Sequence, residues 1–555
     1  MKKYFCFVVV ILFLSINLFS QNQLTFQVDM RIPIEHSVFR PLQGDSLVLR
    51  GNLNGWQGNR LHLSDADSDS IYTLSHDFTG FEAGVIEYKF VIRQAGGRDI
   101  WEQNPEKDNP PYGNRKIVLS GSPQILPASP FDLDRYILNA NYQFSIPQLQ
   151  EDYRQMRETI QGLHPALYDF TDKATFDSLF EARYRLIDGP MTGVEFFRIV
   201  NPLMTSIGCG HSAVYMPEAW WQGQPDRFFP LQVRFVENKL FVLHNLSSRN
   251  EIVSGSRIDS INGLSASEIA GRLLSGISSD GFRKGYRISH LNERFAWLYA
   301  LHYGFPEKFR ISYFSPAENL QKSIETEAVA GKILSEASPR KPLLEFEIIG
   351  GKSTAILTIN NFNYYNEQKR FYKFIDSAFA EINDEEIQNL ILDLRDNDGG
   401  DPFCSAYLLS YLTPQPIPYF DEPFGKYADL AQPIHLAENR FAGSLYTLIN
   451  GKCFSTTGHL AALLKYHRIG TFIGSETGGT YSCNDAKAII PLKNTNLMLQ
   501  VAQGSFAVAV QGMFKDRGII PDYTVRPAIE DILAGRDAEK EFVLELIDKN
   551  SGDDQ

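Results

Sequence analysis

The chain has 555 residues, which at about 150 residues per domain predicts three or four domains. With 43% apolar and 21% charged residues, the composition is that of a folded soluble protein, and it excludes a disordered chain, a collagen-like chain and a small disulfide scaffold. The 53 basic and 66 acidic residues give a net charge of −13, which excludes the basic surface that binds nucleic acid or anionic membranes.

Residues 1–20 have the pattern of a secretory signal peptide, in which Lys2 and Lys3 precede a short apolar run. The alternative is an uncleaved membrane anchor, but Ser15 and Asn17 interrupt a run that is already close to the lower length limit for a spanning helix. No later segment has the roughly 18 apolar residues that a spanning helix needs. We therefore expect an exported protein, in the periplasm, at the cell surface or secreted, with no membrane-spanning segment after signal cleavage.

Residues 21–120 predict an N-terminal β-sandwich. Apolar and polar side chains alternate over short stretches that Asp-, Ser- and Gly-rich turns separate, which is the pattern of half-buried strands. Several short strands at this spacing are typical of two packed antiparallel sheets. The stretches expected as strands are 24–30, 46–50, 71–74 and 86–92.

Four segments of this region carry a resemblance: 51–56, 87–91, 101–102 and 113–115. They resemble starch-binding-type carbohydrate modules, and the resemblance implies a glucan as a partner. A flat aromatic side chain suits the apolar face of a sugar ring, so Trp56, Trp101 and Tyr88 are the residues expected to contact it. The alternative is that Trp56 and Trp101 are core residues of the sandwich.

A linker and a helical region follow the sandwich. Residues 121–143 contain three prolines among scattered polar residues and predict a linker. Apolar residues from Leu149 to Ile160 then recur three or four positions apart, which is a helical period. We expect residues 144–227 to be mainly helical.

Residues 228–330 predict a small α+β domain. Two strand-like stretches, 231–235 and 239–243, precede a third that ends in Ile-Asn-Gly at residue 263, and a helical stretch over 265–274 follows. This order resembles a PDZ-like domain, a class that binds an extended peptide by adding it as a strand to a sheet edge. The alternative is an unrelated small α+β insertion.

Residues 340–535 predict an α/β core, and residues 536–555 a C-terminal tail. Strand-like and helical stretches alternate, and the strand over 389–394 is apolar almost throughout, as in a parallel sheet covered on both faces. The predicted fold class is therefore multidomain: an N-terminal β-sandwich, a helical segment, a PDZ-like α+β domain and a C-terminal α/β core. The expected core strands and helices are 353–359, 368–382, 389–394, 444–449, 456–466 and 468–473.

Three loops concentrate residues that can do chemistry. A buried strand runs into an acidic loop that ends in Gly399 and Gly400, whose flexible backbone can present N–H groups to an anion. Ser455 lies between a strand and a helix, where the helix N-terminus favours developing negative charge. His211 follows two glycines at the end of a helical region. Each has a structural alternative: a plain turn, a helix N-cap and a hydrogen-bonding histidine.

The order of these loops, with the His first, then the PDZ-like segment, the Gly loop and the Ser, resembles the tail-specific, or C-terminal processing, serine peptidase superfamily, including its tricorn-like branch. The resemblance covers residues 146–530. It implies a peptidase core in which Ser455 is the nucleophile. It also implies an oxyanion hole that the backbone N–H of Thr456 forms with that of Gly399 or Gly400. The segments that match best are 392–400, 454–457 and 473–479.

The base that activates the serine distinguishes the branches of this superfamily. In one branch it is a lysine, but Thr480 occupies the corresponding position and Lys487 is the nearest alternative. In the tricorn-like branch it is a histidine, and His211 lies at the matching position. That branch has a serine directly before its histidine, whereas this chain has Gly210. The residues that could supply polar support instead are Ser212 and Glu476.

These residues predict an exported serine peptidase that cleaves extended peptides or proteins through an acyl-enzyme. A neutral imidazole can take the proton of a serine hydroxyl, which is otherwise a poor nucleophile near neutral pH. The sequence predicts no cofactor, no metal and no nucleic-acid partner. Two other functions stay open: a non-catalytic peptide- or ligand-binding protein on the same fold, and a protein that docks on polysaccharide through its N-terminal module.

Four cysteines remain after the signal peptide, and each lies beside one of the catalytic loops: Cys209, Cys404, Cys453 and Cys483. Export makes disulfides possible, and we expect at least one pair to stiffen these loops. Alternatively, each is a small core residue. A metal site with a nearby histidine is a further alternative, but the spacings match no common zinc pattern.

Overall fold

A computed structural model describes residues 23–35, 37–78, 84–102, 114–119, 122–132, 142–337, 341–350 and 353–553. The chain divides into two compact units, residues 1–139 and 140–555, and each is described by itself. The expected signal peptide lies outside the described residues, as do residues 133–141 of the expected linker. No helix in the described ranges combines the length and the apolar character that crossing a membrane requires.

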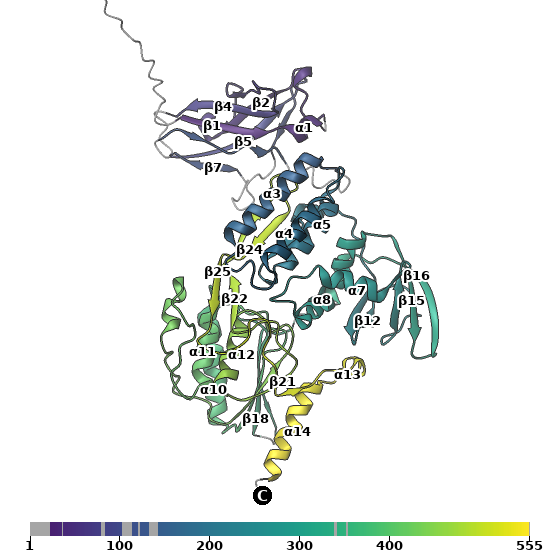
Figure 1. Cartoon of the computed structure of the whole chain (residues 1–555), viewed down its shortest axis with the longest axis vertical. Coiled ribbons are helices and arrows are strands. Elements are labelled where there is room, and N and C mark those ends of the chain that lie inside the picture. The colour runs from purple at the N-terminus through teal and green to yellow at the C-terminus, as the bar shows by residue number, and fades with distance from the viewer. Residues whose placement is uncertain are drawn as a thin grey trace, which may run out of the picture. The chain divides into compact units, whose positions relative to one another are not determined.

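The N-terminal unit contains two β-sheets whose inward-facing side chains form one hydrophobic core (Figure 1). The first sheet has the order β4-β1-β8, with β9 also paired to β1, and the second has the order β3-β2-β5-β6, with β7 paired to β5. The strands are β1 (Gln23–Asp29), β2 (Ser46–Gly51), β3 (His62–Leu63), β4 (Ile71–Asp77), β5 (Val85–Arg93), β6 (Asp99–Trp101), β7 (Arg115–Val118), β8 (Gln124–Ile125) and β9 (Ser129–Pro130).

Two expectations for this unit are corrected. The described part of the expected linker contains two short strands of the first sheet, because β8 and β9 pair in parallel with β1. Tyr88 offers no face to a sugar, because its ring is buried and packs edge-on against Phe26 and Phe90. Trp101 is half-buried, and the Arg50 guanidinium lies 5.1 Å from its ring centre.

The second unit begins with a helical part that carries His211. Helix α5 ends just before this residue, and the short strand β10 after it pairs with β24, about 290 residues later in the chain. β24 also pairs with β23, which completes a three-stranded sheet. The elements are α3 (Ile146–Leu163), α4 (Lys173–Tyr184), α5 (Gly193–Ser206), β10 (Ala213–Tyr215), α6 (Glu218–Gln222), β23 (Ala488–Pro491) and β24 (Met498–Val501).

Residues 228–337 form an antiparallel sheet of order β11-β12-β13-β15-β16, with the helices α7 and α8 packed on it. The edge strand β11 is not free along its whole length: the Phe235 N–H donates to Asn292 Oδ1 of α8 at 2.6 Å. The elements are β11 (Leu231–Val236), β12 (Lys239–Asn245), β13 (Arg257–Ile261), β14 (Leu264–Ser265), α7 (Ala266–Ser275), α8 (Lys284–Tyr303), β15 (Lys308–Ser315), β16 (Leu320–Glu327) and α9 (Gly331–Glu336).

The C-terminal core is a six-stranded sheet of order β17-β18-β19-β20-β21-β26, parallel from β18 onward (Figure 1). Helices α10, α11 and α12 cover one face of it. The elements are β17 (Leu344–Ile349), β18 (Thr354–Ile359), α10 (Gln368–Asp384), β19 (Asn389–Asp393), α11 (Pro402–Leu412), β20 (Ser444–Ile449), α12 (Thr456–Tyr466), β21 (Thr471–Gly474), β22 (Ser482–Asp485), β25 (Gly504–Ala507), β26 (Tyr523–Thr524), α13 (Ile529–Ala534) and α14 (Ala538–Asp553).

Residues 536–553 are not a tail, which corrects a third expectation. They contain α14, whose Val543 and Ile547 pack against Ile391 and Leu448 on the second face of the core sheet. Both faces of β19 and β20 are thus buried, which explains why these strands are apolar along their length. In a parallel sheet the loops after neighbouring strands emerge at one edge, so the loops after β19 and β20 are brought together there.

Candidate active site

Ser455 lies directly before α12, in the loop after β20, with backbone angles φ 53° and ψ −125°. A positive φ in a non-glycine residue costs roughly 1–3 kcal/mol and persists only where the surroundings enforce it. Here two backbone hydrogen bonds flank the serine: Phe454 N–H donates to Asn397 O at 3.1 Å, and Gly479 N–H donates to Cys453 O at 2.8 Å. Ser455 is the N-cap residue of α12 by its backbone, because its carbonyl accepts the His459 N–H at 3.0 Å, but its hydroxyl makes no capping bond to the helix.

His211 approaches Ser455 from the helical part of the unit. Its Nε2 lies 3.2 Å from Ser455 Oγ, although 244 positions separate the two residues in sequence. Both are buried, with exposed fractions of 6% for His211 and 8% for Ser455. The imidazole stacks on the Phe454 ring, with 4.7 Å between centroids. For the hydroxyl to donate to Nε2, the ring must carry its own proton on Nδ1.

The backbone around His211 is fixed by two segments that are distant in sequence. Gln500 Nε2 donates to His211 O at 2.9 Å, and Ala502 N–H donates to Ser212 Oγ at 3.1 Å. On the other side, Gly210 N–H donates to Asp280 Oδ1 at 2.8 Å. The position of the imidazole is therefore a product of tertiary packing rather than of local structure.

Gly210 is required by the close packing of Phe454. A Cβ at this position would lie 2.5 Å from the Phe454 ring, far inside van der Waals contact. A serine therefore does not fit before His211 while the Phe454 ring stacks on the imidazole.

The Gly399–Gly400 loop lies against the nucleophile. A Cβ on Gly399, whose φ is +100°, would lie 2.8 Å from Ser455 Cβ. The Gly399 N–H is already used, because it donates to Asn397 Oδ1 at 2.8 Å. In the described part of the chain, the N–H groups of Gly400 and Thr456 have no acceptor, and Thr456 Oγ1 donates to Gly400 O at 2.6 Å. Of the two glycines, Gly400 therefore has the free donor that an oxyanion hole needs.

The structure does not bring Glu476 or Ser212 to the imidazole nitrogens. Glu476 accepts from Gly518 N–H at 2.9 Å and pairs with Arg517. Ser212 Oγ is bonded to Ala502 N–H, as described above. Neither residue considered for the lysine branch is engaged at the site: Lys487 is exposed, and Thr480 Oγ1 lies 3.4 Å from Phe514 O.

Residues 353–525 match the model of Peptidase family S41. This segment is a Peptidase family S41 domain, so the chain carries a serine protease domain. No curated protein is significantly similar to it in sequence.

Solved structures of similar fold include mature CPAF, at 13% identity over 73% of this chain and 98% of CPAF, with a TM-score of 0.52. Mature CPAF complexed with lactacystin is 12% identical over 72% of this chain and 98% of the CPAF chain, with a TM-score of 0.51. The photosystem II D1 C-terminal processing protease is 15% identical over 71% of this chain and 98% of its own, with a TM-score of 0.37. At these identities the likeness to CPAF shows a common fold.

The four cysteines of the second unit are all unpaired and buried, so the expected disulfide is wrong. Burial raises the pKa of the Cys209 thiol to about 12 and that of Cys404 to about 12, which keeps both protonated and poorly nucleophilic near neutral pH. Cys483 lies beside the Ser455 hydroxyl, and burial raises its pKa well above the usual value. These thiols act as packing groups around the site.

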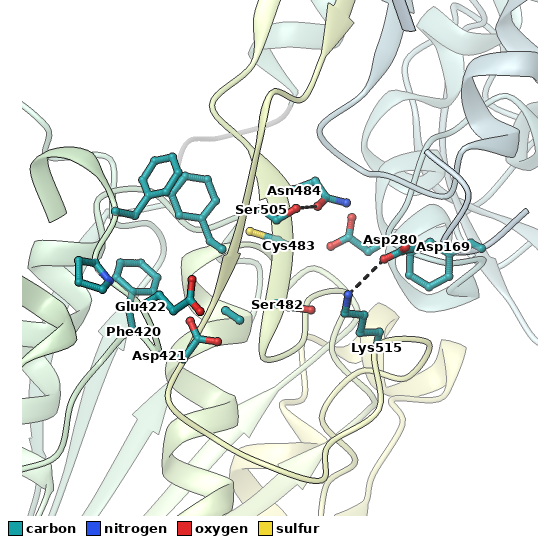
Figure 2. A pocket seen from close by; sticks show the side chains of 15 residues that line it. Asp169, Asp280, Phe420, Asp421, Glu422, Ser482, Cys483, Asn484, Ser505 and Lys515 are labelled. Atoms are coloured by element: carbon teal, nitrogen blue, oxygen red, sulfur yellow. Dashed lines mark hydrogen bonds and ion pairs between the residues drawn. The ribbon is translucent and has the colours of Figure 1, made fainter. Parts of the chain in front are cut away.

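A surface cavity of about 280 Å³ lies next to His211 and Ser455, and Figure 2 shows the side chains that line it. Cys483, which contacts Ser455, is in its wall, as is Asp280, which holds Gly210. Aromatic rings and carboxylates make up about half of the lining, together with Lys515; they are Phe170, Phe420, Phe424, Phe506, Asp169, Asp421 and Glu422. A second and larger groove of about 1440 Å³ runs between β11, the start of α8 and the core loops that contain Asp396 and Glu476.

Three titratable residues near the site are absent from the sequence prediction. Asp280 is described above, and Asp485 Oδ2 lies 3.6 Å from His211 Nε2. His459, four residues after Ser455, is buried between Tyr419 and Phe420, and neither ring nitrogen has a partner among the described residues. Burial lowers the pKa of His459 to about 3, so its imidazole is neutral. No pattern around these three residues distinguishes them from ordinary polar positions.

Proposed function

We propose that the protein is an exported peptidase in which Ser455 is the nucleophile and His211 the general base. The observation that carries this proposal is the 3.2 Å approach of His211 Nε2 to Ser455 Oγ, across two parts of the unit that only folding joins. A nucleophile and base within hydrogen-bond reach are the minimum requirement for acyl transfer.

The reaction then proceeds in two halves. His211 Nε2 takes the Ser455 proton as Oγ attacks the peptide carbonyl, and the N–H groups of Gly400 and Thr456 stabilise the oxyanion. The C–N bond breaks as Nε2 returns the proton to the leaving amine, which leaves an ester on Ser455. Water attacks this ester with His211 again as the base, and the acid product leaves with the hydroxyl restored.

The substrate is an extended peptide or a protein segment. Supporting this, the cavity beside Cys483 can receive one side chain next to the scissile bond, and the larger groove gives the rest of a chain a path toward β11. We assign residues 228–330 to a PDZ-like domain that lines this path. Because Asn292 already occupies the Phe235 N–H, we expect the domain to guide the peptide without pairing along the whole of β11.

Two further parts of the proposal concern the N-terminal half. We infer a signal peptide over residues 1–20, tested by N-terminal sequencing of the mature protein, which should begin near Gln21.

We also infer a carbohydrate-binding-like β-sandwich over the first unit, with Trp56 and Trp101 as the remaining candidates for sugar contact. Retention of the full protein on a glucan gel, reduced by Trp56→Ala, supports that role, and equal elution of both proteins removes it.

Peptide cleavage tests the main proposal. The purified protein is incubated with a mixture of unstructured peptides, and products are identified by mass spectrometry. We expect cleavage by the wild type and none by Ser455→Ala, with both proteins showing the same thermal unfolding. A wild type that binds peptides without cleaving any would instead indicate the non-catalytic function.

A further inference from the structure

Two buried polar atoms near the base have no hydrogen-bond partner in the parts of the chain that the structure describes: Nδ1 of His211 and Oδ2 of Asp280. A buried, unpaired polar atom costs about 1–3 kcal/mol, so such atoms need an explanation. The nitrogen must hold a proton if Nε2 is to act as a base, and a carboxylate oxygen is a strong acceptor for that proton.

Asp280 is placed to serve His211. It lies in the segment between α7 and α8, and only 5% of it is exposed. Its Oδ1 accepts the N–H of Gly210, the residue directly before His211, and its charge interacts with His211. The carboxylate is thus tied to the same turn that presents the imidazole, and Figure 2 shows it at the wall of the cavity beside the site.

The surroundings of Asp280 decide whether it can act as a carboxylate. Burial raises its pKa, whereas the charges of His211 and Arg283 and the Gly210 N–H favour the ionised form. Arg283 is itself buried and fixed, since its guanidinium donates to Gly478 O at 2.7 Å and to Arg517 O at 3.2 Å. An anionic Asp280 therefore has a fixed cation near it.

We propose that Asp280 is the positioning residue for His211: its Oδ2 accepts the Nδ1 proton, fixes the reactive tautomer and stabilises the imidazolium that forms when Ser455 is deprotonated. The proposal rests on the proposed function of His211 as base. The two atoms form no direct hydrogen bond in this structure. One water, or the tightening that accompanies substrate binding, closes the gap. Gly210 contributes by offering its N–H where a side chain has no room.

Other groups that face His211 do not replace Asp280. Asp485 lies 3.6 Å from Nε2, the nitrogen that must be free of a proton to accept one, so it cannot fix the reactive tautomer. His459 comes from α12 and is neutral, and the Cys483 thiol is protonated. Asp485 therefore provides the matched control: a second carboxylate beside the same ring, on the wrong nitrogen.

The test compares Asp280→Asn, Asp280→Glu and Asp485→Asn in the full protein, with one peptide that has lysine and one that has leucine before the scissile bond. We expect Asp280→Asn to lower kcat by about 10²–10⁴-fold for both peptides, with KM within about twofold, and to shift the pH profile of kcat. The kcat of Asp280→Glu should be at least about tenfold higher than that of Asp280→Asn, and the kcat of Asp485→Asn should be less than about tenfold below that of the wild type. The proposal is overturned if Asp280→Asn keeps kcat within about threefold, or if it raises KM for the lysine peptide alone, which would make Asp280 a specificity residue.

A second measurement does not depend on the folding of any Asp280 variant. In protein labelled with ¹⁵N-histidine, the signals of His211 are assigned by their loss in His211→Gln. The proposal predicts that the neutral ring carries its proton on Nδ1, and a proton on Nε2 overturns it. Should the protein cleave no peptide, the proposed function fails, whereas only a proton on Nε2 overturns the role of Asp280.

Discussion

The two turns that meet at the site are built in different ways. The Ser455 turn follows from one sheet: β20 ends, the Gly399 loop after the neighbouring β19 packs against it, and backbone hydrogen bonds flank the serine on both sides. The His211 turn is assembled from segments near residues 210, 280 and 500, and one nitrogen of its ring lacks a partner among the described residues. The nucleophile is thus fixed by the core fold, whereas the base depends on long-range packing that a single substitution can disturb.

Removing the nucleophile is the substitution with the largest expected effect. Ser455→Ala should lower kcat by about 10⁴–10⁶-fold, because the acyl-enzyme cannot form. Its thermal unfolding should be unchanged, since the sheet and not the hydroxyl fixes the turn. Progress curves at high enzyme concentration measure the loss, and residual activity above about one part in a thousand would contradict the role of Ser455.

Removing the base should cost nearly as much. His211→Gln is expected to lower kcat by about 10³–10⁶-fold, because the Ser455 hydroxyl loses its proton acceptor. The two residues act as one unit, so Ser455→Ala with His211→Gln should be no slower than Ser455→Ala alone. If the fold-losses in kcat of the two single variants instead multiply in the double variant, His211 does not act through Ser455.

A sharper test moves the His211 turn while leaving the imidazole itself unchanged. Gly210→Ser should lower kcat by about 10–100-fold, because its Cβ forces the Phe454 ring away and unstacks the imidazole. Gly189→Ser is the control, since a Cβ there meets nothing within 4 Å. Equal rates for the two variants would show that the base turn tolerates displacement.

Weakening the nucleophile turn should have a smaller effect. Thr456→Val removes the 2.6 Å bond from Oγ1 to Gly400 O, which orients the glycine whose N–H is a proposed oxyanion donor. We expect kcat to fall about 3–10-fold with KM unchanged. Thr447→Val on β20 is the matched control, because Thr447 Oγ1 is buried and has no partner in the described residues. If kcat falls as far in Thr447→Val as in Thr456→Val, the hydrogen bond from Thr456 does not orient the Gly400 donor.

The smallest effect concerns stability rather than rate. Burial lowers the pKa of His459 to about 3, so the unfolded chain, with an ordinary histidine near 6.5, binds one more proton between these values. The free energy of unfolding contributed by this group is therefore fully present above pH 6.5 and falls by about 1.4 kcal/mol per pH unit as the pH drops below it. His459→Leu should flatten this dependence by one proton between pH 6.5 and 4, measured by urea unfolding, and an unchanged slope would contradict the assignment.

Much of the core could be predicted from the sequence, because apolar strands bounded by turns leave few alternatives. The strand over 444–449 and the helix over 456–466 have the bounds predicted for them, and the break between them is Ser455. Tyr88 could have been placed correctly, since it alternates with Ile86 and Phe90, which are both buried. The spacing of Val543 and Ile547 likewise carries the signal for α14.

The contacts around His211 could not be predicted from the sequence in the same way. Asp280 stands in a Ser-Ser-Asp-Gly turn, and nothing in that pattern distinguishes a buried carboxylate from a solvated one. Its role depends on the packing of three segments far apart in sequence. Similarly, only coordinates show that Asn397 occupies the Gly399 N–H and leaves Gly400 free. Sequence patterns record local periodicity and burial, whereas these contacts arise from the tertiary arrangement.

The most direct measurement is the rate at which a fluorophosphonate modifies Ser455, followed by peptide mass spectrometry across pH 5 to 9. Phosphonylation needs the hydroxyl to lose its proton but needs no substrate recognition, so it isolates the His211–Ser455 step. The account predicts modification at Ser455 alone at every pH, and a loss of at least about 10³-fold in the rate of modification in His211→Gln. Modification of His211→Gln at the wild-type rate, or of another residue in its place, would contradict it.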